Sequence, residues 1–234
     1  MNNLIIDERR IRYLNDYSNI AKGPIVYWMN RDQRVEDNWA LLHAQALSFQ
    51  HNQPIIVVFC VAPNFLGATL RQYDFMIKGL QEIEGKLKKY NISFILLKGI
   101  VTEELPKLLS LVKAQVVVTD FSPIKFIKGW KNTIASSLTI PLIEVDAHNI
   151  VPCWVASHKA EFSAYTLRLK ISRILMDFLT EYPKLLVHPF AIEFELPKID
   201  WPNIFQGLSF NKEILPAEWI KPGEDAALKC LSNF

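Results

Sequence analysis

A polar cluster directly follows the first buried apolar run of the chain. Residues 25–29 are typical of a strand buried on both faces, and Asn30, Arg31 and Asp32 come next. Ligands of parallel α/β sheets bind outside the carboxyl ends of the strands, so this polar edge is a candidate binding site. The alternative is an Arg–Asp network that only fixes the turn into the next helix, and residue types alone favour that interpretation.

Other predicted strands end in residues that could extend this edge. The expected strand order places the ends of residues 25–29 and 115–119 on either side of one crevice. Aromatic, carboxylate and amide groups together suit a flat heteroaromatic ligand with polar edges, although each aromatic taken alone is more typical of a core residue. The candidate ligand-binding residues are Trp28, Met29, Asn30, Arg31, Asp32, Phe59, Lys98, Asp120, Phe121 and Ser122.

The elements that position these residues alternate between strand and helix. Apolar runs predict five strands, at 25–29, 55–60, 93–97, 115–119 and 142–145. Helical periodicity predicts helices at 39–50, 70–90, 103–112 and 123–137, and a short amphipathic helix after Asp7 that carries Ile11 and Leu14. This pattern predicts an α/β fold: a doubly wound, Rossmann-like, five-stranded parallel sheet of order 3-2-1-4-5 with flanking helices.

Composition excludes several classes of protein. The net charge of +2 over 234 residues argues against an extended nucleic-acid surface, and Lys125, Lys128 and Lys131 are expected on a solvated helix face. The sequence has no glycine-rich phosphate loop, no nucleophile elbow and no zinc-type Cys/His spacing. The N-terminus is unlike a signal peptide and the longest apolar run, 54–63, is too short to cross a bilayer, so we expect a cytoplasmic protein.

The last fifty residues have a different character. Residues 183–222 carry six prolines and several large aromatic residues, which is typical of an extended linker that crosses a protein surface. A helix is expected from Glu224, with Leu228, Leu231 and Phe234 on one face. We therefore expect a domain at 1–182 and a linker with the first helix of a further domain at 183–234, and the exposed tail could allow self-association.

Five segments in order resemble the class II cyclobutane pyrimidine dimer photolyases of the photolyase/cryptochrome family. Their similarity extends from about Arg10 onward, and in the fifth segment Leu169 stands where proline is expected. The segments are 27–34 with 37–41 (YWMNRDQR and DNWAL), 68–80 (ATLRQYDFMIKGL), 118–123 (VTDFSP), 145–154 (VDAHNIVPCW) and 164–171 (AYTLRLKI).

The resemblance implies a light-harvesting N-terminal domain and linker, truncated before the helical domain that binds FAD and damaged DNA. The family reaction is light-driven repair of pyrimidine dimers, so this chain alone is expected to be inactive and to need that domain from the same gene or a separate chain. An antenna chromophore, 8-hydroxy-5-deazaflavin or folate, would bind here, and FAD only in the missing domain. Residues expected at the domain interface, or else in a local loop network, are Asp146, His148, Asn149, Trp154, Lys159, Tyr165 and Arg168.

Two other functions stay open from the sequence. One is a stand-alone α/β protein that binds a small ligand or a nucleotide, which a glycine-rich phosphate loop would have supported. The other is an interaction subunit without a ligand, which would bind a soluble partner or aggregate through its aromatic tail.

Overall fold

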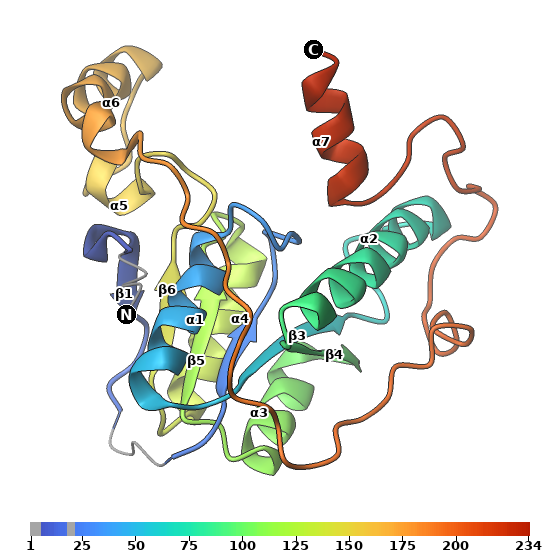
Figure 1. The fold of residues 1–234 in the computed structure, drawn as a ribbon. Coiled ribbons are helices and arrows are strands. Elements are labelled where there is room, and N and C mark those ends of the chain that lie inside the picture. Colours follow the sequence, from blue (N-terminus) through green and yellow to red (C-terminus); the bar gives the residue numbers. More distant parts are fainter. Residues whose placement is uncertain (1–5, 18–21) are drawn as a thin grey trace.

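The computed structural model describes residues 6–17 and 22–234, and its centre is a six-stranded sheet of order β1-β6-β5-β2-β3-β4 (Figure 1). Five strands are parallel and follow the predicted order, with the switch point between β2 and β5. Continuous runs of valine and isoleucine suit strands that are buried on both faces. The parallel strands are β2 (Ile25–Trp28), β3 (Ile55–Val61), β4 (Ser93–Lys98), β5 (Val116–Asp120) and β6 (Leu142–Val145).

The prediction of a helix after Asp7 is wrong. A single 3₁₀ turn, η1 (Glu8–Arg10), leads into β1 (Ile11–Tyr13), which pairs antiparallel with β6 and makes the sheet six-stranded. The turn is stabilised by the Asp7 side chain, which accepts a hydrogen bond from the Arg9 backbone N–H at 2.9 Å. Pairing with a distant strand outweighs the weak local helical pattern of these residues.

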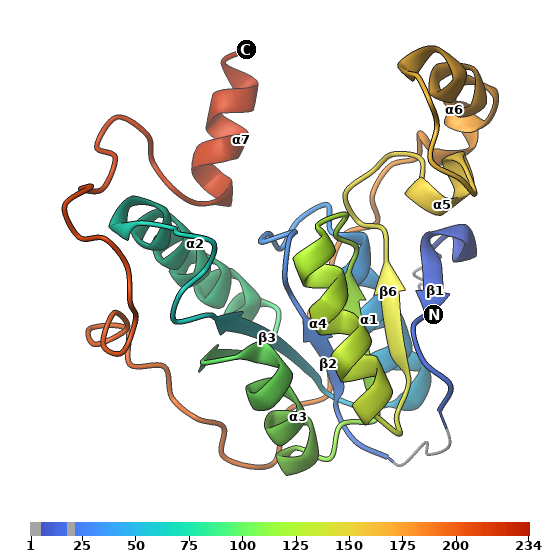
Figure 2. The ribbon, with the colours of Figure 1, turned by 180° about the vertical axis from the view of Figure 1, so that it is seen from behind.

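Helices cover both faces of the sheet. Alternate residues of β2 divide between two cores: Ile25 and Tyr27 pack beneath α1 and α2, and Val26 and Trp28 pack beneath α3 and α4. Figures 1 and 2 show these two layers from opposite sides. The four helices are α1 (Trp39–His51), α2 (Leu70–Lys89), α3 (Val101–Leu111) and α4 (Lys125–Ser137).

Three further helices lie beyond the carboxyl edge of the parallel strands. The short α5 (Cys153–Ala156) and α6 (Ala164–Phe178) form a small cluster with its own apolar contacts around Phe178. The segment 179–223 then crosses α1, passes below α3 and rises beside α2 to α7 (Glu224–Ser232) (Figure 1). Trp201, Phe205 and Phe210 pack against the domain core, as the sequence predicted for a surface-bound linker. Phe194 and Trp219 do not follow this prediction, because they are 44% and 85% exposed.

Among the described residues, no helix is both long and apolar enough to cross a membrane. Residues 1–5, which entered the argument against a signal peptide, lie outside the described residues.

Candidate ligand-binding site

An uncharged cavity lies at the carboxyl ends of β2 and β3. Its volume is about 170 Å³, and its walls come from both strands, from segment 62–76 and from α3 and α4. The described residues that line it include no Asp, Glu, Lys or Arg. The lining residues are Trp28, Met29, Asn30, Gln33, Phe59, Cys60, Val61, Ala62, Phe65, Ala68, Gln72, Tyr73, Met76, Val101, Ile127 and Trp130.

Aromatic rings and amide groups give this cavity its chemical character. Phe65, Phe126 and Trp130 form a cluster beside it, with the Phe126 and Trp130 ring centroids 4.5 Å apart. The side-chain amide of Gln72 accepts a hydrogen bond from the Thr69 backbone N–H at 2.8 Å, which fixes Gln72 at the start of α2. Apolar walls with a few fixed polar groups are the usual composition of a site for a small organic molecule.

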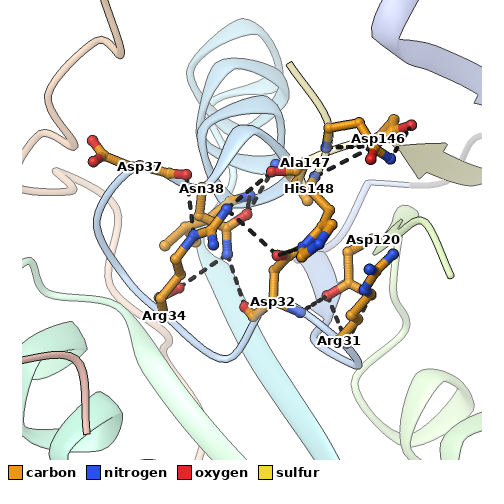
Figure 3. A network of polar contacts seen from close by, with 12 residues as sticks. Arg31, Asp32, Arg34, Asp37, Asn38, Asp120, Asp146, Ala147 and His148 are labelled. Carbon is orange, nitrogen blue, oxygen red and sulfur yellow. Dashed lines mark hydrogen bonds and ion pairs between the residues drawn. The ribbon is translucent and has the colours of Figure 1, made fainter. Parts of the chain in front are cut away.

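The carboxylate of Asp120 organises the loop beside the cavity (Figure 3). Asp120 is fully buried at the end of β5, and it accepts hydrogen bonds from the backbone N–H groups of Asn30, Arg31 and Asp32 at 3.0–3.1 Å. The Tyr27 hydroxyl donates a fourth at 3.1 Å. Burial raises the pKa of Asp120, whereas its backbone donors favour the ionised form. Asp120 therefore binds the protein's own backbone.

Asp32 occupies a second buried carboxylate position in the same loop. Its Oδ1 lies 3.2 Å from His148 Nδ1 and 3.4 Å from a terminal nitrogen of Arg34 (Figure 3). Its Oδ2 is buried without a hydrogen-bond partner among the described residues. The predicted Arg–Asp network is therefore present, and Arg34 also donates to the Ala147 carbonyl at 3.0 Å, which joins this loop to the segment after β6.

Asn38 caps the start of α1 and holds the other end of the loop. Its Oδ1 accepts from the N–H groups of Ala40 and Leu41, and its Nδ2 donates to the carbonyl oxygens of Asp32 and Arg34. The loop from 30 to 38 is thus fixed at both ends before any ligand binds.

The ten candidate residues do not share one crevice, which corrects the geometric expectation. Trp28, Met29, Asn30 and Phe59 line the uncharged cavity. Arg31 and Asp32 line a separate charged hollow of about 700 Å³ between the loop after β2, α2 and α7, which also exposes Glu36, His148, Tyr182 and Leu231. The two sites adjoin at Gln33 and Met76, which line both.

The remaining candidates have structural contacts instead. Phe121 packs edge-on against Trp154, with ring centroids 5.6 Å apart, because the chain turns away from the cavity after β5. Ser122 Oγ accepts from the Ile124 backbone N–H at 3.4 Å just before α4. Lys98 is exposed and donates to the Gln206 carbonyl of the linker at 3.4 Å.

The residues expected at a domain interface fall into two groups, those with local contacts and those that are exposed. Asp146 is buried and accepts hydrogen bonds from the Asn149 side chain and the Cys153 N–H, so these residues form the local loop network that was the alternative. Trp154 Nε1 donates to the Arg9 carbonyl at 2.8 Å. Three residues are exposed on or near α6: Lys159, Tyr165 and Arg168.

Lys131 is buried, contrary to the expectation of a solvated lysine face. Its ammonium group lies 2.8 Å from Glu144 Oε1 and also donates to the Asp120 carbonyl oxygen. Arg12 of β1 binds the other oxygen of Glu144 at 2.7 Å. The signal that could have revealed this is spacing, because Lys131 lies on the helix face of Ile127 and Ile134, both buried.

Sequence reasoning also missed several cavity residues that come from outside the strand ends. Gln72 could have been found, because Thr69 and Gln72 have capping-box spacing and a helix that follows a parallel strand begins at the carboxyl edge of the sheet. Phe65 and Trp130 carry no such local signal, since only the tertiary fold brings them together.

The chain was compared with known families, curated proteins and solved structures. The family model described as DNA photolyase matches residues 25–188. The deoxyribodipyrimidine photo-lyases of Potorous tridactylus and Arabidopsis thaliana are 44% and 42% identical to it, over 97% and 89% of this chain. The chain spans only 44% and 43% of the length of these two relatives.

A solved structure shares the fold. The crystal structure of a bacterial class III photolyase from Agrobacterium tumefaciens aligns with a TM-score of 0.62 at 20% identity, over 92% of this chain and 45% of that one. At this identity the likeness concerns architecture, which agrees with the six-stranded, mostly parallel sheet. Because the family model covers most of the chain and includes the whole loop at the end of β2, this protein belongs to the DNA photolyase family and corresponds to its N-terminal domain.

Proposed function

We propose that this chain is the light-harvesting domain of a class II photolyase and that its uncharged cavity binds the ring system of an antenna chromophore. The observation that carries the proposal is the cavity at the ends of β2 and β3, lined by aromatic and amide side chains, in a member of this family. The chromophore class is 8-hydroxy-5-deazaflavin or a folate.

The residues present fit such a ring. Trp28, Phe59 and Trp130 offer aromatic surfaces, and Asn30, Gln33 and Gln72 offer amide donors and acceptors for polar ring edges. A volume of about 170 Å³ is smaller than the roughly 300 Å³ at which complete ligand pockets begin, so the cavity suits a ring rather than a whole chromophore with its side chain.

The protein's own contribution is to position and shield that ring. When bound, the chromophore supplies absorption of a photon and transfer of its energy to a flavin. The chain holds the cavity edge in place through Asp120, whose buried carboxylate fixes the N–H groups of Asn30 and Arg31. Apolar walls exclude water from the ring, which limits quenching by solvent.

The wider activity of the family is also a proposal for this chain. We propose that it acts in light-driven repair of pyrimidine dimers only together with a helical domain that binds FAD and damaged DNA. The relatives are more than twice as long as this chain, and α7 leaves apolar side chains exposed, with Leu231 at 71% and Leu228 at 42%. An apolar helix face of that kind is typical of a surface that another domain covers.

A cavity-filling substitution tests the binding site. Ala68 lines the cavity, so Ala68→Trp should fill it and weaken 8-hydroxy-5-deazaflavin or folate binding by at least about tenfold in a fluorescence titration. Leu66→Trp is the matched control, because Leu66 lies in the same loop but is 71% exposed and outside the cavity lining. Equal affinity of the wild type and Ala68→Trp would place the chromophore elsewhere.

A further inference from the structure

We propose that the linker is part of the binding site: segment 205–211 braces one wall of the uncharged cavity, with Phe210 as the positioning residue. This inference rests on the proposed function for its ligand, but its structural content concerns the protein alone. It makes the linker more than a connection between two domains.

The braced wall is the segment after β3. Six of the sixteen residues that line the cavity come from 62–76, more than from any other segment. Part of this wall is an irregular loop that turns tightly, with Leu66 at φ 49° and Gly67 at φ 73°. A positive φ at leucine is costly, so the loop needs contacts from outside itself to stay in one conformation.

The linker supplies those contacts at both ends of the loop. The Ser209 backbone N–H donates to the Pro63 carbonyl at 2.7 Å, and the Leu70 N–H donates to the Asn211 carbonyl at 3.0 Å. Leu70 opens α2, and its N–H is one of the donors that a helix start leaves without a partner inside the helix. The linker therefore caps the start of α2 and holds the loop through one backbone hydrogen bond at each end.

Phe210 lies between these two hydrogen bonds and packs on a cavity residue. Its ring stacks on Tyr73, with centroids 4.9 Å apart and an interplanar angle of 28°. The Tyr73 hydroxyl in turn donates to the Ala62 carbonyl at 2.7 Å, and both residues line the cavity. Phe205 packs edge-on against Phe210 at 5.9 Å, which fixes the ring from the linker side.

This arrangement has a functional consequence. A movement of the linker would therefore displace the cavity wall through Phe210 and through the backbone contacts of Ser209 and Asn211. The position of the chain after residue 211 can in this way change how tightly the chromophore is held. Two further contacts fasten the linker before Phe210: Lys98 donates to the Gln206 carbonyl, and Trp201 donates to the Glu84 carboxylate.

The test compares Phe210→Ala with Phe194→Ala in the full chain. Phe194 is a partly exposed linker aromatic that lies outside the cavity lining and lines a different pocket. Phe194→Ala therefore controls for the loss of an aromatic ring from the linker. The rate of amide hydrogen exchange at residues 64–70 measures how firmly the cavity wall is held. Titration with 8-hydroxy-5-deazaflavin measures the affinity of the site.

We expect Phe210→Ala to speed exchange at 64–70 and to weaken probe binding, each by about tenfold, with Phe194→Ala like the wild type. Unchanged exchange at 64–70 in Phe210→Ala would overturn the brace. If the wild type binds no probe, the proposed function fails, while faster exchange in Phe210→Ala still establishes the brace. Equal probe affinity in all three proteins, despite faster exchange, would refute the link from brace to ligand.

Discussion

The backbone N–H of Asp32 donates to the carboxylate of Asp120 at 3.0 Å, which joins the end of β2 to the end of β5. These two strands flank the switch point of the sheet, where α/β proteins bind ligands. A buried carboxylate thus fixes the edge of the candidate site from within.

Replacing that carboxylate should loosen the loop. Asp120→Asn keeps the side-chain volume but places an amide NH₂ group, itself a donor, among several N–H donors. We therefore expect the free energy of unfolding to fall by about 2–3 kcal/mol in urea titrations. Asp37→Asn is the control, because Asp37 is exposed in the same loop and its positive φ suits asparagine. A loss below 0.5 kcal/mol for Asp120→Asn would contradict the role assigned to Asp120.

The buried pair of Lys131 and Glu144 gives a second prediction. Among the described residues, Lys131→Met leaves Glu144 with only Arg12 as a charged partner, and breaking a buried pair costs about 3–5 kcal/mol. Lys131→Met combined with Glu144→Gln should recover part of that loss, and Lys125→Met on the exposed face of the same helix should cost little. A double variant no more stable than Lys131→Met would speak against charge as the cause.

Histidine burial predicts a dependence of stability on pH. Burial lowers the pKa of His43 from 6.5 to about 4, and it also lowers the pKa of His188. As the pH falls from about 6.5 to 4, the unfolded chain binds protons that the folded chain excludes, so stability falls, by up to about 3 kcal/mol for His43.

The measurement is urea unfolding at pH 7.5 and pH 5. We expect His43→Leu to reduce the difference between the two values, and His51→Gln, in the last turn of the same helix, to leave it unchanged. An equally steep loss in His43→Leu would assign the effect to other groups.

The Glu224 carboxylate makes several of the contacts that hold the start of α7. Glu224 accepts from the N–H groups of Val35 and Glu36 and lies 3.0 Å from the Lys86 ammonium. Glu224→Gln removes the charge from all three contacts, so amide exchange in 224–232 should become about tenfold faster with little change in global stability. Glu218→Gln, exposed in the linker, serves as control, and unchanged exchange in Glu224→Gln would show that other contacts hold α7.

Most of the sheet could be predicted from sequence because its strands are long buried runs, such as the three consecutive valines of β5. β1 could not be predicted, because its three residues are too few to show the alternating pattern of a strand. Its pairing also depends on Glu144, which is distant in the sequence. The polar residues at the strand ends were identifiable, but their partners were not. Asp120 could equally have faced a ligand or backbone amides, and only the tertiary fold decides between them.

The central claim is chromophore binding, and the most direct measurement is the absorption and fluorescence of the purified chain titrated with 8-hydroxy-5-deazaflavin, folate and FAD in turn. The account predicts a saturable band shift or fluorescence change with the deazaflavin or the folate, lost in Ala68→Trp, and no response to FAD. Silence with both antenna chromophores, or saturable binding of FAD, would contradict it.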